Sequence, residues 1–484
     1  MEVTIPSDPV PGLLARATKL LEAQFSALPA YQNDLDEAAI LRVLETTAHR
    51  LGDNYPYFHP LYAGQMLKPP HPVARAAYAL AMNINPNNHA RDGGRASSDM
   101  EIEAVRQIAA IFGWTEFLGH LTSSGTMANL EALWVAGQLA PGRRIVGSNQ
   151  AHYTHQRISS VLKLDYTSVA ADHCGRMNLE ALEAELRKGD VGTVVVTLGT
   201  TATGAVDSLD HILPLRQQYG FRIHVDAAYG GYFRLIPGAL DEPTRRAFTA
   251  ADHADSIVID PHKHGLQPYG CGCVLFRDPA VGRFYKHDSP YTYFTSKQSH
   301  LHLSQQRPLA HNPVHLGEIS LECSRAGASA VALWATQQLL PLVPDGEFAR
   351  GLAQSRAAAV ELHRKLSADT GNRFQTSSVP ELDIVTWKLR AESAAKASDL
   401  AQKLFVACAL QDLHLALVQL SLSRFQLPNG NVNSDEQETV TCLRSVLMKP
   451  EHEAWLDRIW ERLISSCAQV IGEEENGNTG SDTH

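Results

Sequence analysis

A lysine and an aspartate, each placed directly after a short apolar segment, have the clearest chemical potential in this sequence. Lys263 closes the motif Asp-Pro-His-Lys after the apolar run 256–259, and Asp226 follows the apolar run 221–225. A lysine amine can form a Schiff base with an aldehyde, and a carboxylate can hold a pyridine nitrogen protonated. These are the two groups that pyridoxal phosphate needs from a protein. For either residue alone, a surface lysine or a helix-capping aspartate is the alternative reading.

Alternating helices and strands between residues 98 and 276 would position this pair. The expected strands are apolar throughout, which is typical of a largely parallel sheet covered on both faces, and the interleaved helices predict a doubly wound α/β domain. Ligands of such domains bind outside the carboxyl ends of the strands, where Asp226 and Lys263 fall. The expected strands are 144–147, 192–198, 221–225, 256–260 and 273–276, and the expected helices are 101–112, 126–139, 179–187 and 207–219.

The remaining segments predict three further parts of the chain. Residues 13–51 have helical periodicity, and the next stretch, 55–62, is rich in prolines and aromatic residues. After a helix at about 328–340, weak strands at 382–389 and 440–447 favour a smaller α+β domain. We therefore expect an N-terminal helical segment (1–75), a large domain (76–350), a small C-terminal domain (351–471) and a disordered tail (472–484).

Composition and charge exclude several classes of protein. The 484 residues carry a formal net charge of −10, which argues against binding to nucleic acid or to an anionic membrane. Seven cysteines, an odd number scattered through a long chain, argue against a disulfide framework. The first residues do not have the pattern of a secretory signal, and no run of eighteen apolar residues occurs. We therefore expect a cytoplasmic protein.

Two small-residue segments could contact a ligand near the lysine. Ser-Ser-Gly-Thr (123–126) stands directly before an expected helix, where free N–H groups and the helix dipole favour a phosphate. Plain N-capping of the helix is the alternative reading. The loop Gly-Thr-Thr-Ala-Thr-Gly (199–204) supplies hydroxyl groups at the end of another strand, although a loop of this composition needs no ligand.

Histidines provide further candidates. His152 follows a predicted strand and could stack on an aromatic cofactor, but Tyr153 and His155 lie in the same segment, and spacing alone does not choose among them. The segment 291–295 has several histidines nearby, but none is spaced as a metal-binding pair, so we expect no metal. We interpret this segment as a mobile loop that closes over the site.

Taken together, the motifs resemble a known family. In chain order they are Thr-Ser-Ser-Gly-Thr, His152, Gly-Thr-Thr, His-Val-Asp-Ala-Ala-Tyr-Gly-Gly and Asp-Pro-His-Lys. This series resembles the group II pyridoxal-phosphate-dependent amino acid decarboxylases, which include aromatic-amino-acid, glutamate, tyrosine and aspartate decarboxylases. The resemblance covers about residues 57–463. It implies a large domain of the fold-type-I, aspartate-aminotransferase-like class, a small-molecule amino acid as substrate, and a homodimer with the site at the subunit interface.

The resemblance also implies roles for individual residues. Lys263 would be the Schiff-base lysine, Asp226 the partner of the pyridine nitrogen, and His152 the residue stacked on the ring. Tyr293 would be the loop tyrosine that protonates the carbanion, and Arg444 would hold the substrate carboxylate. The residues expected to contact the cofactor are Gly125, Thr126, His152, Thr201, Asp226, Ala228, Ser256, His262 and Lys263.

The substrate and the reaction stay open at this point. His264 and Met127 depart from better-known members of the family, although two other stretches look most like prokaryotic tyrosine/aspartate-type members. Aromatic residues at 57, 58 and 62 would suit an aromatic substrate or dimer packing. Candidate cations for an acidic substrate are Lys68, Arg91, Arg95 and Arg325.

We expect decarboxylation of an L-amino acid to the amine and carbon dioxide. The alternatives are another reaction of a fold-type-I pyridoxal enzyme, such as transamination or carbon–carbon cleavage, and a catalytically inactive binding or scaffold protein. Product analysis separates the first two readings, and a protein that takes up no cofactor would favour the third.

Overall fold

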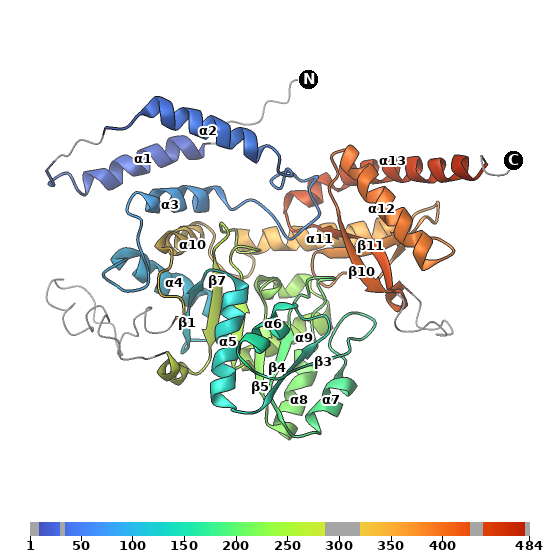
Figure 1. Cartoon of the computed structure of the whole chain (residues 1–484), viewed down its shortest axis with the longest axis horizontal. Coiled ribbons are helices and arrows are strands. Elements are labelled where there is room, and N and C mark those ends of the chain that lie inside the picture. Colours follow the sequence, from blue (N-terminus) through green and yellow to red (C-terminus); the bar gives the residue numbers. More distant parts are fainter. Residues whose placement is uncertain (1–8, 30–33, 286–319, 426–438, 480–484) are drawn as a thin grey trace.

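A seven-stranded sheet organises the large domain (Figure 1). The computed structural model describes residues 9–29, 34–285, 320–425 and 439–479, with side chains as far as Gly472. The strand order is β1-β7-β6-β5-β4-β2-β3, and β7 alone runs antiparallel to its neighbours. The strands are β1 (Leu118–Thr122), β2 (Arg144–Ser148), β3 (Tyr166–Val169), β4 (Val191–Thr197), β5 (Arg222–Asp226), β6 (Ser256–Ile259) and β7 (Gly272–Phe276).

Helices cover this sheet, as the apolar strands predict. Every residue of β4, β6 and β7 is buried, α5 packs on β6 and β7, and α4 packs on β1. The fold class expected from the sequence is confirmed. The helices of this part are α3 (Pro72–Met82), α4 (Arg95–Ile111), α5 (Gly125–Leu139), α6 (Thr154–Val161), α7 (Leu179–Leu186), α8 (Leu209–Tyr219), α9 (Glu242–Ala250) and α10 (Gly327–Leu339), with short 3₁₀ helices at Gly231–Leu235, Pro237–Ala239, Ala251–His253 and Pro279–Phe284.

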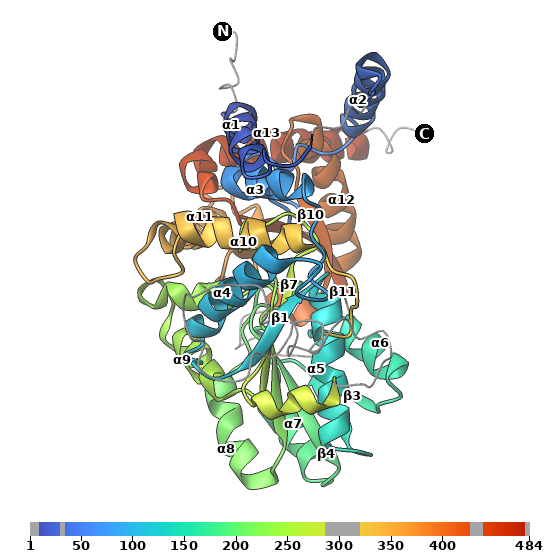
Figure 2. The ribbon, with the colours of Figure 1, turned by 90° about the vertical axis from the view of Figure 1, so that its left-hand side faces the viewer.

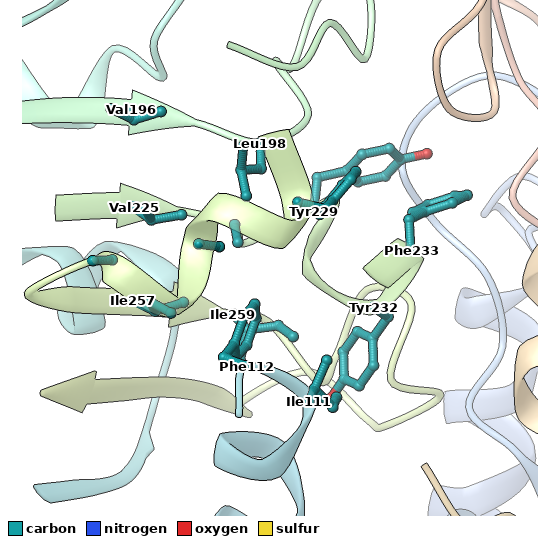
Figure 3. Packing of buried hydrophobic residues seen from close by; sticks show 14 of the residues in the cluster. Ile111, Phe112, Val196, Leu198, Val225, Tyr229, Tyr232, Phe233, Ile257 and Ile259 are labelled. Atoms are coloured by element: carbon teal, nitrogen blue, oxygen red, sulfur yellow. The ribbon is translucent and has the colours of Figure 1, made fainter. Parts of the chain in front are cut away.

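The largest apolar core of the large domain packs strand side chains against α4, α7, α8, α9 and α10. Side chains of β5 and β6 meet Phe112 at the end of α4, and the cluster continues into the turn after β5 (Figure 3). Tyr229 belongs to that turn, and its hydroxyl points away from the apolar cluster (Figure 3). The packing therefore fixes the carboxyl ends of β5 and β6, from which the candidate residues extend.

A second sheet forms the small domain. Its four antiparallel strands have the order β10-β11-β9-β8, so β8 and β10 add to the two strands that the sequence predicts. The helix α13 continues beyond residue 472, where the sequence favours a disordered tail. The elements are α11 (Glu347–Ser367), β8 (Phe374–Thr376), β9 (Ile384–Leu389), α12 (Ala394–Leu410), β10 (Ala416–Ser421), a 3₁₀ helix (Leu422–Phe425), β11 (Thr439–Val446) and α13 (Glu451–Thr479).

The N-terminal segment forms two helices that extend away from the sheet. In both views, α1 (Val10–Ala23) and α2 (Glu37–Leu51) lie on the far side of α3 from the large domain (Figures 1 and 2). No residue of α2 is buried, and Leu41, Val43 and Leu44 are each more than half exposed. Within the described ranges, none of the helices is long and apolar enough to cross a membrane.

Candidate active site

Asp226 and Lys263 face one cavity of about 160 Å³ at the carboxyl edge of the sheet. β5 and β6 are parallel neighbours, with Asp226 opposite Val258, so the residues that follow each strand emerge side by side. The structure thus brings together the two residues with the clearest chemical potential. Other expected cofactor contacts that line the same cavity are Gly125, Thr126, His152, Thr201, Ala228 and His262.

Asp260, for which the sequence alone indicates no role, holds Lys263 at the cavity wall. Nζ of Lys263 lies 3.1 Å from Oδ2 of Asp260, and the Lys263 backbone N–H donates to the Asp260 carbonyl at 2.9 Å. Asp260 opens the Asp-Pro-His-Lys motif, and that tight turn brings the acid and the amine to the same wall. The turn 260–263 therefore fixes the position of the Lys263 ammonium group.

Asp226 is buried, with 4 % of its surface exposed, and is surrounded by donors. His155 Nε2 lies 2.7 Å from its Oδ2, the Ala228 N–H donates to its Oδ1 at 3.1 Å, and Asn129 Nδ2 donates to its Oδ2 at 3.4 Å. Burial by itself would raise the pKa of Asp226, but the bond and charge of His155, with the charge of Lys263, hold it below its ordinary value. The carboxylate is therefore ionised at neutral pH.

The structure separates the two histidines that spacing alone leaves open. His152 lines the cavity, and its Nδ1 lies 2.7 Å from the Thr154 hydroxyl. Burial lowers the pKa of His152, so its imidazole is neutral at pH 7. His155 lies fully buried against Asp226 instead. The contacts of His155 and Asn129 with Asp226 could not be predicted from the sequence, because both depend on how α5 and α6 pack against β5.

The start of α5 supplies the anion-binding end of the cavity. The first N–H groups of a helix have no partner within it, and Ser124 satisfies the one at Met127 through a 3.2 Å bond. Ser124 therefore caps the helix, while Gly125 and Thr126 line the cavity beside it. A Cβ at Gly125 would lie 2.5 Å from the carboxylate of Asp260, so only glycine fits between the helix start and that acid.

Ser256 does not join this group, contrary to the expectation from the resemblance. It begins β6, whereas the cavity lies beyond the strand's other end, and its hydroxyl pairs with His224 Nδ1 at 2.9 Å. It is absent from the cavity lining. The expected phosphate contact of Ser256 is therefore corrected: a four-residue strand separates it from the phosphate end of the site.

Arg444 extends from β11 of the small domain and is buried, with 5 % of its surface exposed. Its Nη1 lies 3.4 Å from the Gln65 side-chain oxygen, while its Nε and Nη2 have no hydrogen-bond partner among the described residues. Burial lowers the pKa of Arg444, and the nearby Tyr229 and Asp383 oppose that effect. Tyr229 also lines the catalytic cavity and donates to Asp383 at 2.6 Å. Two guanidinium donors are thus left for a ligand.

Like Arg444, the remaining candidates do not line the cavity. Arg325 is buried in a bond to Glu101 at 2.7 Å, and Arg91 pairs with Asp99 at the surface. Neither they nor the other proposed cations and aromatic residues, Arg95, Lys68, Tyr57, Phe58 and Tyr62, contribute to the lining. Tyr293 lies outside the described residues, so its role stays a prediction.

One cluster elsewhere brings three potential metal ligands within 4.8 Å of one another, namely Asp172, His173 and Cys174. The Asp172 carboxylate already accepts the N–H groups of Cys174 and Arg176, at 2.9 and 3.0 Å. This is the pattern of a turn closed by its own aspartate. The cluster lies apart from the catalytic cavity.

The donor set of the cavity fits pyridoxal phosphate. An amine (Lys263) suits the aldehyde, an ionised carboxylate (Asp226) suits a protonated ring nitrogen, and the N-terminus of α5 suits the phosphate. A neutral imidazole (His152) is the group expected at the ring. Fold and site together define a pyridoxal-phosphate-binding protein of fold type I.

Comparison with known proteins agrees with this class. The pyridoxal-dependent decarboxylase conserved domain matches residues 54–283. An L-tyrosine decarboxylase of Enterococcus faecium is 25% identical over 564 aligned positions, covering 90% of this chain and 89% of that protein. The L-2,4-diaminobutyrate decarboxylase of Rhizobium meliloti is 35% identical over 226 positions, covering 43% and 44%. The chain is thus similar to the pyridoxal-dependent decarboxylases, and the match to their conserved domain spans residues 54–283.

A solved structure shares the fold. The structure of Oryza sativa TDC with PLP and tryptamine superposes with a TM-score of 0.72, covering 96% of this chain and 99% of that chain. Only 17% of the residues are identical, so this likeness concerns the fold.

Replacing Gly125 by alanine tests the anion end of the cavity. The added Cβ would press on the Asp260 carboxylate and push the start of α5 out of place. We expect Gly125→Ala to weaken binding of pyridoxal phosphate about tenfold or more, which corresponds to about 1.4 kcal/mol. The measurement is an absorbance titration of the apoprotein with the cofactor. Gly238→Ala, where the new Cβ meets nothing within 4 Å, is the matched control. Equal affinities would contradict the assignment.

Proposed function

We propose that this protein is an amino acid decarboxylase that uses the Lys263–Asp226 cavity to convert an L-amino acid to its amine and carbon dioxide. The observation that carries the proposal is the convergence of Lys263 and an ionised Asp226 on one cavity beside the start of α5. Similarity to pyridoxal-dependent decarboxylases supports this reaction over transamination or carbon–carbon cleavage. A scaffold protein would have no need of this combination.

Asp226 has the main electrostatic task. When bound, pyridoxal phosphate supplies an electron-withdrawing ring that accepts the electrons of the bond broken at the substrate's α-carbon. Asp226 keeps the proton on the ring nitrogen, because a charged carboxylate favours a charged partner. His155 keeps Asp226 charged despite burial, through the 2.7 Å contact with Oδ2. The chain thus holds one proton at a defined atom by means of two buried side chains.

Other residues bind and orient. Lys263 anchors the cofactor, and Asp260 holds the Lys263 amine when it is free. His152 and Ala228 line the cavity where the ring would lie. The apolar cluster beneath β5 and β6 excludes water from the side of the cavity facing the core.

Arg444 is the proposed partner of the substrate carboxylate. Its Nε and Nη2 are buried without a partner in the described part of the chain, which is costly unless a ligand satisfies them. Its neighbour Tyr229 belongs to the cavity lining, which connects the guanidinium to the reacting site. A planar guanidinium binds a carboxylate through two parallel bonds, which fixes the orientation of that group.

The substrate is proposed to have a neutral side chain, with L-tyrosine as the first choice. Lys263 is the only lysine or arginine in the described lining of the cavity, and the cations considered for an acidic side chain lie elsewhere. Two relatives bear the names L-tyrosine decarboxylase and L-2,4-diaminobutyrate decarboxylase. Aspartate, glutamate and 2,4-diaminobutyrate are therefore the alternatives to measure beside tyrosine.

We also propose a cytoplasmic homodimer. The apolar side chains of α1 and α2 that face solvent, such as Leu20 and Val43, would be covered by a second copy of the chain. All seven cysteines are free, which suits a reducing compartment. Cell fractionation tests the compartment.

The reaction is tested by incubating the cofactor-loaded protein with tyrosine, dihydroxyphenylalanine, aspartate, glutamate and 2,4-diaminobutyrate. We expect carbon dioxide and the matching amine from one of them, measured by mass spectrometry. Asp226→Asn should lower the rate about a hundredfold or more while Lys263 still carries the cofactor, because the ring loses its charged partner. Asp190→Asn, which alters a half-exposed carboxylate paired with Arg144 away from the cavity, serves as the control. A keto acid as the product would contradict the proposed decarboxylation.

Arg444→Met tests the carboxylate site. Loss of a charge-assisted bond of about 1.5–3 kcal/mol predicts a rise in KM of about ten- to a hundredfold. Cofactor affinity should stay unchanged, and Arg444→Lys should recover part of the loss. Arg364→Met removes an exposed arginine paired with Glu361 and should leave KM as it is. An unchanged KM in Arg444→Met would remove the residue from the site.

The dimer is tested by sedimentation of the intact protein. We expect a dimer at micromolar concentration, because α2 alone exposes several large apolar side chains. Replacing Leu41 and Leu44 by glutamate should favour the monomer by placing charges on that face. Thr46→Glu and Thr47→Glu form the control, since both threonines already face solvent on the same helix. A monomeric wild-type protein would contradict the proposal.

A further inference from the structure

A second and larger cavity lies where the two domains meet. Its volume is about 630 Å³, against about 160 Å³ for the catalytic cavity. Its walls come from the segment before α3, the loop after Lys263, the start of α11 and the start of α13. No part of the mechanism above uses this space.

Two lysines line this cavity, and the structure describes no acidic partner for either. Lys449, with 3 % of its surface exposed, donates from Nζ to the Tyr62 carbonyl at 2.6 Å, and Lys68 Nζ donates to the Met448 carbonyl at 3.3 Å. Among the described residues, neither ammonium group has a carboxylate within 4 Å. The buried Lys449 charge has only a carbonyl and the face of the Tyr62 ring, 5.2 Å away, to offset its burial, which is costly, and a second cation nearby adds to that cost.

Their environment makes both lysines easy to deprotonate. Burial lowers the pKa of Lys68 to about 8, against a smaller opposing effect of Asp383 and Glu451. Burial and then the charge of Lys68 lower the pKa of Lys449 to about 7, with Glu451 opposing. An anion between the two amines would reverse this effect and draw protons onto them. The other ionisable groups that line the cavity are His71, His264, Glu347, Arg350 and Glu451.

His264 gives an independent sign of a missing ligand and connects the two cavities. Its ring is fully buried and lines the second cavity, yet its Nδ1 has no hydrogen-bond partner among the described residues. Its Nε2 lies 3.2 Å from Asp383, which also accepts the hydroxyl of Tyr229 from the catalytic cavity. His264 is also the residue next to Lys263 in the chain.

The remaining lining indicates what kind of anion would fit. Pro69, Pro70, Leu266, Phe348 and Leu352 present apolar surface around the two amines. Sites for small molecules commonly combine such surface with a few polar groups that fix orientation. An ion as small and as strongly hydrated as inorganic phosphate would leave this surface unused.

We propose that the second cavity is a binding site for an organic carboxylate, with the carboxylate between Lys68 and Lys449 and the apolar part against the prolines and Phe348. The bound anion lies next to the His264–Asp383 contact. A change there reaches Tyr229 at the catalytic cavity, so the site is suited to regulation of the enzyme.

Calorimetric titration of the cofactor-loaded protein with phenylacetate tests the proposal. At pH 8, in Tris and in triethanolamine buffers, the enthalpies should differ by the amount expected for net proton uptake, because binding raises the pKa of both amines. At pH 6, where both amines are already protonated, binding should persist and their share of the uptake should vanish. Phenylacetamide, which lacks the charge, should not bind.

Variants assign the binding to this cavity. Lys68→Met and Lys449→Met should each weaken phenylacetate binding at least tenfold, and the proton uptake should fall with it. Lys188→Met, which removes an exposed lysine paired with Glu185, is the matched control. Arg444→Met should leave the binding intact, because it alters only the proposed substrate site.

Three results would overturn the proposal. Binding that survives both lysine substitutions but is lost in Arg444→Met would place phenylacetate in the catalytic cavity. Binding without proton uptake at pH 8 would exclude the two amines, whether or not the variants fold. Inorganic phosphate binding with uptake, in the absence of phenylacetate binding, would exclude an organic carboxylate. None of these readouts depends on catalysis, so a failure of the proposed reaction is seen separately.

Discussion

A charged aspartate beneath the cofactor cavity is the constraint that the large domain is arranged to satisfy. Burial alone would neutralise Asp226, and the sheet and helices bring His155 and Asn129 against it to prevent that. Asn129 in turn accepts from His224 at 2.8 Å, and His224 pairs with Ser256. A hydrogen-bonded chain therefore runs from the carboxylate along the interior of the sheet. The packing of α5 and α6 against β5 thus buries apolar side chains and also keeps Asp226 charged.

The small domain contacts the catalytic cavity through one residue of its lining, Tyr229. Asp383, just before β9, binds the hydroxyl of Tyr229, and Arg444 on β11 lies beside the same pair. Figure 3 shows Tyr229 at the margin of the apolar core with its hydroxyl directed outward. Buried polar groups tolerate little misalignment, because an unpaired one costs about 1–3 kcal/mol. The small domain is therefore held in a defined position relative to the sheet.

Local patterns predicted the central strands and the Lys263–Asp226 pair, because apolar runs and the residues that end them are adjacent in the sequence. They missed β1, whose His120 is buried against Glu131, and the edge strand β3, of whose four residues only the last is buried. Contacts between residues far apart in the sequence, such as that of His155 with Asp226, could not be predicted, because no local sequence pattern marks them. The resemblance placed Ser256 in the site by spacing, but the strand carries it to the opposite end.

Two consecutive residues of one short loop line different cavities. Lys263 lines the catalytic cavity, and His264 lines the larger one. Compounds that mimic an amino acid or the cofactor resemble ligands of every pyridoxal enzyme, so selectivity against this one protein is hard to achieve in the catalytic cavity. The larger cavity presents lysines and prolines drawn from two separate segments, 68–72 and 449–450. A selective inhibitor of this protein is therefore better sought there, in molecules that need resemble neither substrate nor cofactor.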